Sequence, residues 1–236
     1  MNTNPPGRPP SRRREFLSGV RDEAPILLGV APFGVIFGAL AMAAHLPPVV
    51  GQAMSSVIFA GSAQFIAAQL FAGPATGFVI VLVVFVVNLR HALYSASVAP
   101  HVAHLGPAWK AVLAYLLTDE AYAVVISNYA RGGDASRKHW YYLGAGLTLW
   151  ACWQLCTAMG ILVGARIPEN WPLSFMLPLT FIALVVPTLR QRSAIVAALA
   201  AGLAGYLTMG FPLKTGLLVA AIVGIGAGLS LEGRDR

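Results

Sequence analysis

The stretch GFVIVLVVFVVNLRHALYSASVA, residues 77–99, decides the class of fold. Residues 77–87 are apolar throughout, and Asn88, Arg90 and His91 follow before the segment becomes apolar again. A helix of roughly 20 apolar residues crosses the hydrocarbon core of a bilayer, which is about 30 Å thick. The segment therefore predicts a membrane-spanning helix that carries polar groups at its centre.

The composition of the whole chain agrees with this prediction. Of its 236 residues, 57% are hydrophobic and 11% are charged, against roughly 25% charged in a soluble domain. The mean hydropathy is +0.71. These values exclude a soluble enzyme, a disordered chain and a disulfide-stapled module. The net charge of +7 does not indicate a nucleic-acid partner, because long apolar stretches separate the basic residues and leave no continuous basic face.

The same length criterion predicts an all-α integral membrane protein, a polytopic bundle of about eight transmembrane helices. Seven is the alternative, because the last three segments are short. Helix-breaking residues inside the spans predict breaks near the bilayer midplane, at Pro32 and Gly34, at Gly61, and at Pro178 and Pro187. The predicted spans are 24–44, 49–72, 77–99, 109–129, 141–164, 172–189, 193–209 and 213–231.

The basic residues predict the orientation. With eight crossings and the N-terminus inside, only Lys110, Arg166 and Lys214 fall in outer segments, and Arg90 lies within a span. The remaining Lys and Arg residues then face the cytoplasm, as the positive-inside rule demands. We expect residues 1–23 to be a disordered basic cytoplasmic tail, residues 24–231 the transmembrane domain, and residues 232–236 a short cytoplasmic tail.

Polar residues fall near the middle of several predicted spans, and therefore at a similar depth. An ionised side chain at the bilayer centre costs about 2.5–3.5 kcal/mol on insertion scales, so it must face the bundle interior and be paired. Arg90 can neutralise only one of Asp119 and Glu120. We expect Asp119 to join Arg90 in a substrate network and Glu120 to carry a coupling proton, although the reverse assignment stays open. The candidate site residues are Ser62, Gln64, Asn88, Arg90, His91, Asp119, Glu120 and Tyr122.

Four segments resemble the AzlC family, the large subunit of bacterial branched-chain amino acid exporters: FAGSAQF (59–65), NLRHALYSAS (88–97), LTDEAYA (117–123) and LPLTFIALVVP (177–187). The resemblance implies a bacterial inner-membrane exporter of leucine, isoleucine and valine, with methionine as a further candidate. It also implies a small four-span partner subunit, AzlD. The chain has no phosphate-cradling motif, so we expect it to use the proton motive force, without a cofactor or a metal.

The sequence also bears on three other function classes. An intramembrane enzyme is disfavoured, because the chain has neither an HExxH nor a GxSxG motif. A channel, or a structural subunit whose partner holds the substrate site, remains the alternative. The GxxxG spacings at Gly34 and Gly38 and at Gly224 and Gly228 predict either packing within the chain or a docking face for a second membrane subunit.

Overall fold

A computed structural model of the chain describes residues 11–132, 137–165, 189, 191–211 and 216–232. All the regular secondary structure of these residues is helical, which confirms the predicted all-α class for this part of the chain. The chain divides into two compact units, residues 1–171 and 172–236, which are considered separately here. The predicted span 172–189 lies outside the described residues, apart from Leu189.

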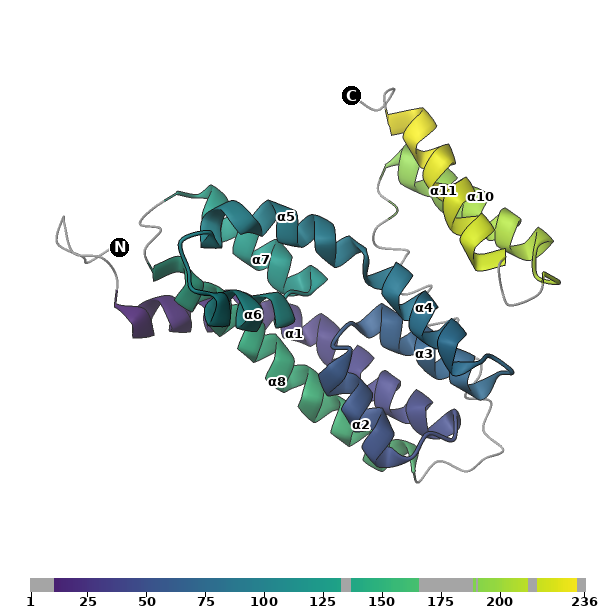
Figure 1. Cartoon of the computed structure of the whole chain (residues 1–236), viewed down its shortest axis with the longest axis horizontal. Coiled ribbons are helices and arrows are strands. Elements are labelled where there is room, and N and C mark those ends of the chain that lie inside the picture. The colour runs from purple at the N-terminus through teal and green to yellow at the C-terminus, as the bar shows by residue number, and fades with distance from the viewer. Residues whose placement is uncertain (1–10, 133–136, 166–188, 190, 212–215, 233–236) are drawn as a thin grey trace. The chain divides into compact units, whose positions relative to one another are not determined.

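The first unit is built on two long helices, α1 (Arg12–Ala43) and α8 (Lys138–Gly164), which pack along one another. Gly19 lies against Tyr141, and Gly38 lies against Gly160, so the two helices run parallel (Figure 1). Both helices begin at the same end of the unit. This end carries the arginines in the first turn of α1, and also Arg137 and Lys138 at the start of α8. We call this end the basic end, and the other the far end.

Close packing explains why α1 is continuous. A methyl group at Gly38 would collide with the carbonyl oxygen of Thr157, so the two backbones touch there. The helix runs through Pro25 and Pro32 without interruption, so the predicted break at Pro32 was wrong. It also begins at Arg12, and the prediction of a disordered tail was therefore wrong for residues 12–23.

A third crossing joins the two ends in the opposite direction. It consists of α4 (Gly77–Asn88) and α5 (Arg90–Val102), which meet at Leu89. The ring of His101 lies 4.7 Å from that of Tyr129, whose hydroxyl and carbonyl groups bond Lys138, so α5 finishes at the basic end. Together with α1 and α8, residues 77–102 complete a set of three helices in the described part that are long and apolar enough to cross a membrane.

The predicted span 49–72 is a hairpin instead of a crossing. It forms α2 (Pro48–Val57) and α3 (Gly61–Ala72), separated by residues 58–60. Gly51 packs near Ala41 and Ile161 at the far end, whereas Gly61 packs on Trp153, further into the unit. From Gly61, α3 runs back toward the far end. Only residues 73–76 separate it from α4, and the two helices pack side by side (Figure 1).

The predicted span 109–129 is a second hairpin, and it enters from the basic end. Its halves are α6 (Pro107–Tyr115) and α7 (Asp119–Ala130), separated by residues 116–118. Trp109, near the start of α6, lies 5.0 Å from Trp140, ring to ring, and Tyr129, near the end of α7, bonds Lys138. Both ends of the hairpin are thus at the basic end, while its tip reaches Gly146 through Leu116.

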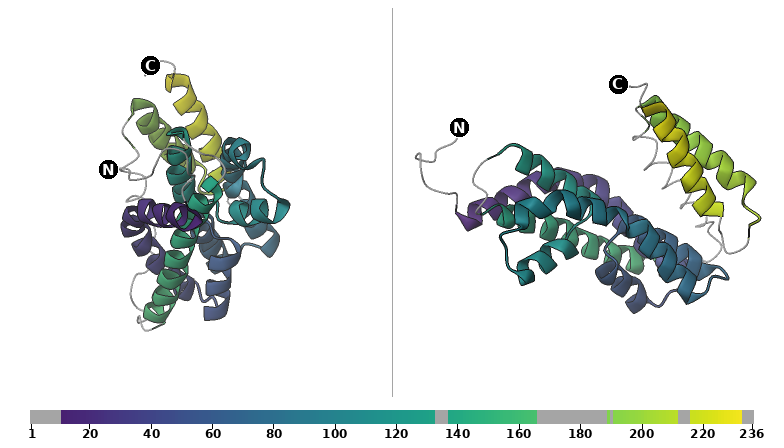
Figure 2. Two further views of the ribbon diagram at one scale, coloured as in Figure 1. Left: turned by 90° about the vertical axis from the view of Figure 1, so that its left-hand side faces the viewer. Right: turned by 45° about the horizontal axis from the view of Figure 1, so that its top comes forward.

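Helix length explains why these two segments do not cross. Their four helices have 9 to 12 residues, and at 1.5 Å per residue the longest covers about 18 Å. Each half therefore reaches only part of the way through the hydrocarbon core. The chain therefore crosses to the far end in α1 and enters from there with the α2–α3 hairpin. It then crosses back in α4 and α5 and enters from the basic end with the α6–α7 hairpin (Figures 1 and 2).

This topology moves one cation relative to the sequence prediction. Lys110, expected in an outer loop, follows Trp109 at the basic end, where Trp109 lies 4.9 Å from His139, ring to ring. Among the described residues of the first unit, every Lys and Arg except Arg90 therefore belongs to the basic end. The segregation of positive charge is sharper than eight simple crossings would produce.

The second unit contains α10 (Arg192–Leu207) and α11 (Gly216–Glu232), which pack against each other. Gly224 lies against Ala201 and Gly228 against Ala197, so the helices are antiparallel. Both GxxxG spacings named from the sequence therefore serve packing within the chain: Gly34 and Gly38 against α8, and Gly224 and Gly228 against α10.

Candidate functional site

The site lies where the interrupted segments begin again. Gly61 starts α3, Arg90 starts α5 and Asp119 starts α7. The break at Gly61 was predicted from the sequence, whereas those at Leu89 and at residues 116–118 were not. Since the first N–H groups of a helix lack intrahelical partners, the starts of α3 and α7, which follow extended residues, bring positive partial charge into the interior of the unit. Leu89 keeps a helical conformation, so α5 continues α4 with only a local irregularity.

Local chemistry fixes the start of α7. Thr118 is the N-cap, and its side-chain oxygen accepts a hydrogen bond of 3.3 Å from the backbone N–H of Ala121. Asp119 and Glu120 occupy the first turn, where the helix dipole favours negative charge. The sequence Thr-Asp-Glu is thus a helix start, although it lies in the middle of an apolar segment.

The break between α2 and α3 is formed differently. Phe59 adopts a φ of 39°, in the left-handed region that costs energy for a residue with a side chain. The hydroxyl of Tyr115, at the end of α6, donates a 2.6 Å hydrogen bond to the carbonyl of Ser56 in the last turn of α2. The α6–α7 hairpin therefore supplies a hydrogen bond to a carbonyl group that lacks a helical partner at the end of α2.

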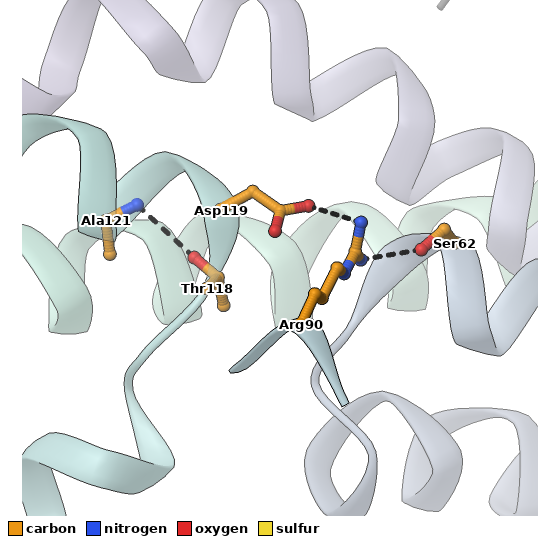
Figure 3. Close-up of polar contacts among 5 residues, drawn as sticks. All are labelled: Ser62, Arg90, Thr118, Asp119 and Ala121. Atoms are coloured by element: carbon orange, nitrogen blue, oxygen red, sulfur yellow. Dashed lines mark hydrogen bonds and ion pairs between the residues drawn. The ribbon is translucent and has the colours of Figure 1, made fainter. Parts of the chain in front are cut away.

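Arg90 joins the three helix starts. Its Nη1 lies 2.8 Å from Oδ2 of Asp119, and its Nη2 donates a 2.6 Å hydrogen bond to the hydroxyl of Ser62. Figure 3 shows the guanidinium group between the two partners, one from each hairpin. The side chains of Arg90 and Asp119 are 32% and 37% exposed, so the ion pair remains within reach of a ligand.

Several polar atoms around this ion pair have no hydrogen-bond partner in the part of the chain that the structure describes. They are buried atoms of four neighbouring residues: Oδ1 of Asn88, Nε of Arg90, Nε2 of His91 and Oδ1 of Asp119. Buried polar atoms are nearly always hydrogen-bonded in folded proteins, so such a cluster calls for a ligand or for ordered water. It contains acceptors and a guanidinium donor, and could therefore receive both ends of a zwitterion.

Aromatic rings line one side of the cluster. Tyr94 stacks on Tyr122 with ring centroids 4.5 Å apart, and His91 meets Tyr94 edge to face at 5.9 Å. The Tyr122 hydroxyl donates to Oγ of Ser97 at 3.0 Å. Tyr122 and His91 therefore belong to the surroundings of the ion pair. Tyr94, which was not among the predicted site residues, lies between them.

Gln64 contacts α8. It is fully buried, and its Oε1 accepts a 3.0 Å hydrogen bond from Nε1 of Trp153, while its Nε2 has no hydrogen-bond partner among the described residues. Gln154 is also a packing group, since its Oε1 accepts from Gln52 at 2.8 Å and from Ser56 at 2.9 Å. These amides attach the α2–α3 hairpin to α8, which is the interhelical role of polar side chains in membrane proteins.

Glu120 follows Asp119 in the first turn of α7 and is partly buried. Asp119 and Arg90 are among the groups that act on it electrostatically. It also interacts with Glu23 of α1. Glu23 was assigned to the N-terminal tail, yet it is fully buried, and neither carboxylate oxygen has a hydrogen-bond partner among the residues that the structure describes.

A periodicity signal could have identified Glu23. It lies four residues after Gly19 and seven before Val30, and all three are on the buried face of α1. Gly19, Glu23 and Val30 are at i, i+4 and i+11, and at 3.6 residues per turn these positions share one face of a helix. Extending the packing face of Gly34 and Gly38 backward along α1 therefore reaches this carboxylate.

Comparison with known proteins gives the chain a family context. A family model described as AzlC protein matches residues 25–167. The chain is 26% identical to the inner membrane protein YgaZ of Escherichia coli, over 95% of this chain and 92% of that protein. It is 30% identical to an uncharacterized membrane protein of Helicobacter pylori, covering 76% of this chain and 79% of the relative.

One further relative has a name that states an activity. The branched-chain amino acid transport protein AzlC of Bacillus subtilis is 27% identical to the chain, over 68% of this chain and 61% of that protein. No solved structure matches the chain. The residues of the Arg90 cluster all lie within the region matched by the family model.

Proposed function

Because this chain belongs to the AzlC family, a family of membrane proteins, we propose that it is a secondary transporter that exports branched-chain amino acids. The proposed substrates are leucine, isoleucine and valine, with methionine as a further candidate. In this proposal proton movement drives export across the bacterial inner membrane, and a small four-span AzlD-like subunit completes the transporter. The segregation of positive charge at the basic end supports a cytoplasmic position for that end.

One observation carries the proposal: Arg90 bridges Ser62 and Asp119, which come from hairpins that enter from opposite ends. Discontinuous helices that meet inside a membrane protein are typical of transporter substrate sites. The carboxylate group of an amino acid substrate can bind Nε of Arg90, which has no hydrogen-bond partner among the described residues, together with the N–H groups at the start of α3. Its ammonium group can bind the unpartnered Oδ1 of Asp119.

The same bridge suggests how access alternates. In this proposal each hairpin closes the path from its own end, and Arg90 holds both hairpin tips. A bound zwitterion replaces part of this bridge with its own charges. In the proposed mechanism either tip can then withdraw without leaving an uncompensated charge behind.

The test is uptake and efflux of labelled leucine in proteoliposomes containing the full chain, with and without its small partner subunit. We expect Arg90→Gln to abolish transport, and Arg90→Lys to restore little, because an ammonium group cannot contact two partners in the fork geometry of a guanidinium group. Arg21→Gln, which removes an exposed arginine at the basic end, is the matched control and should transport normally.

Two outcomes would contradict the proposal. Transport of none of the four amino acids by the wild-type protein, with its partner present, would remove the substrate assignment. Unchanged transport by Arg90→Gln would place the substrate site elsewhere, and would favour the alternative in which this chain is a structural subunit.

A further inference from the structure

The most unusual buried group of the first unit is the carboxyl of Glu23. Its side chain has no exposed surface, and neither oxygen has a hydrogen-bond partner among the described residues. An ionised carboxylate without partners is very costly to bury, because it loses its hydration and gains nothing in exchange. Burial therefore favours the neutral acid, COOH, at this position.

The groups that face Glu23 offer it no cation. Its electrostatic partner on α7 is Glu120, another carboxyl group, and on α8 it acts on Tyr141. On its own helix, the adjacent Asp22 points elsewhere and accepts a 2.7 Å hydrogen bond from the Tyr141 hydroxyl. Arg90, which is paired with Asp119 and bonded to Ser62, acts on Glu120 as well and favours its charged form, whereas no cation is found to act on Glu23 among the described residues. Two carboxyl groups on facing helices cannot both ionise readily, so one proton between them is favoured.

A cavity at the basic end lies close to this pair along the chain, and neither carboxyl group is part of its lining. It has a volume of about 550 Å³ and lies between α1, α7 and α8. Its lining includes Asp22, Ser127, Asn128 and Tyr141. Tyr141 thus lines the cavity and also interacts with Glu23, while Glu120 lies one turn before the α7 residues of the lining.

We propose that Glu23 and Glu120 form a proton-binding site, in which one proton is shared between the two carboxyl groups and exchanges with water in the cavity at the basic end. Binding converts one carboxylate to COOH and consumes one proton from that water. Release returns the proton and leaves both groups ionised. The role of this site in coupling rests on the proposed function. Its ability to hold a proton rests only on the burial of Glu23 and on the interaction between the two carboxyl groups.

The site joins two elements with different roles. Glu23 belongs to α1, which is packed along α8, whereas Glu120 is in the first turn of α7, next to Asp119 of the substrate cluster. Loss of the shared proton would create repulsion between α1 and the tip of the α6–α7 hairpin. Protonation would thereby favour the position of that tip in which Asp119 reaches Arg90.

Infrared spectroscopy tests proton binding without requiring transport. The purified full chain at neutral pH should show a carbonyl stretching band of a protonated carboxyl group, which shifts in D₂O. We expect Glu23→Gln and Glu120→Gln each to remove this band. Asp22→Asn, which changes the neighbouring exposed carboxylate and retains an acceptor for Tyr141, is the matched control and should keep it.

Absence of the band from the wild-type protein over the neutral range would overturn the proposal. So would a band that persists in Glu23→Gln, because the proton would then belong to another group. If Glu23→Gln does not fold, Glu23→Met supplies an apolar side chain of similar length at the same position, and titration of the wild-type band with pH gives an independent reading.

Transport then tests coupling. In proteoliposomes with labelled leucine, Glu23→Gln should lose leucine-driven proton movement and keep leucine counterflow, which needs no net proton transfer. A Glu23→Gln protein that still moves protons with leucine would overturn the coupling role. If the wild-type protein moves no leucine, the proposed function fails, whereas the infrared band still decides whether the proton site exists.

Discussion

The two hairpins are attached to the rest of the first unit in contrasting ways. The α2–α3 hairpin is fastened along α8 by side-chain hydrogen bonds, among them Ser55 to Thr157 at 2.8 Å and Gln52 to Gln154 at 2.8 Å. The α6–α7 hairpin is held at the basic end by aromatic and backbone contacts, such as the Tyr142 hydroxyl to the carbonyl of Leu113 at 2.8 Å. Its tip carries the charged side chains.

This difference indicates which part of the unit serves as a scaffold. The α1–α8 pair is closely packed through glycines, and the α2–α3 hairpin shares a polar network with it. The tip of the α6–α7 hairpin is bonded through Tyr115 to Ser56 and Trp150. It also carries charge interactions, namely Asp119 with Arg90 and Glu120 with Glu23. A change of protonation or of bound ligand would therefore act on this tip before it acts on the scaffold.

Gly38→Leu should produce the largest effect. The leucine side chain would collide with the backbone of Thr157 and Gly160, and since both helices are rigid at this point, α1 and α8 would separate. We expect no folded protein by size-exclusion chromatography in detergent. Gly29→Leu on the same helix, where nothing lies within 4 Å, should fold normally. A folded Gly38→Leu protein would show that the α1–α8 contact is not the scaffold.

The direction of the α6–α7 hairpin can be tested by labelling. In a chain without native cysteines, Lys110→Cys should react with an impermeant maleimide from the same side of the membrane as Arg12→Cys, because both residues lie at the basic end. Val49→Cys, at the start of α2, should react only from the other side. Reaction of Lys110→Cys together with Val49→Cys would mean that residues 109–129 cross the membrane.

Gln154→Leu should weaken the attachment of the α2–α3 hairpin. It removes hydrogen bonds with Gln52, Ser56 and the carbonyl of Ser55, and at about 0.6 kcal/mol for each bond the free energy of unfolding should fall by about 2 kcal/mol. Unfolding in mixed micelles measures this change. Leu155→Val on the exposed face of α8 is the control. An equal loss of unfolding free energy in this variant would show that the hydrogen-bond network does not stabilise the hairpin.

Thr118→Val should have the smallest effect, and it should be confined to the α6–α7 hairpin. It removes the cap of α7 at nearly constant side-chain volume, which costs about 1 kcal/mol of helix stability. Hydrogen exchange of the first turn of α7 should accelerate, while exchange in α3 should stay unchanged. Ser127→Ala, which removes an exposed hydroxyl of the same helix, should change neither.

The arrangement of the polar residues was largely predictable from the sequence. Placing each at the middle of its apolar segment put Ser62, Arg90 and Asp119 at one depth, and the structure brings these three together. The reason is general, since ionised groups in a membrane protein must find partners away from lipid. The functional roles assigned to these residues stay predictions.

The hairpins were not predictable by the same reasoning. An apolar segment of about 20 residues with a polar centre fits a crossing as well as it fits two half-helices. The α6–α7 break contains no proline or glycine. Thr118 is a local N-cap signal, and the apolar length of residues 109–129 outweighed it in predicting a single span. Conversely, Pro32 satisfies the usual criterion for a break, yet packing on α8 keeps α1 continuous.

The sequence by itself determined that the protein is a helical membrane protein, which polar groups lie deep within it, and that positive charge gathers at one end, because hydropathy and charge act over each segment independently. Only the tertiary structure decided which segments turn back, which carboxylate meets Arg90, and that Glu23 is buried opposite Glu120. Those outcomes depend on which helices touch, and close contacts between backbones are set by residues far apart in the chain.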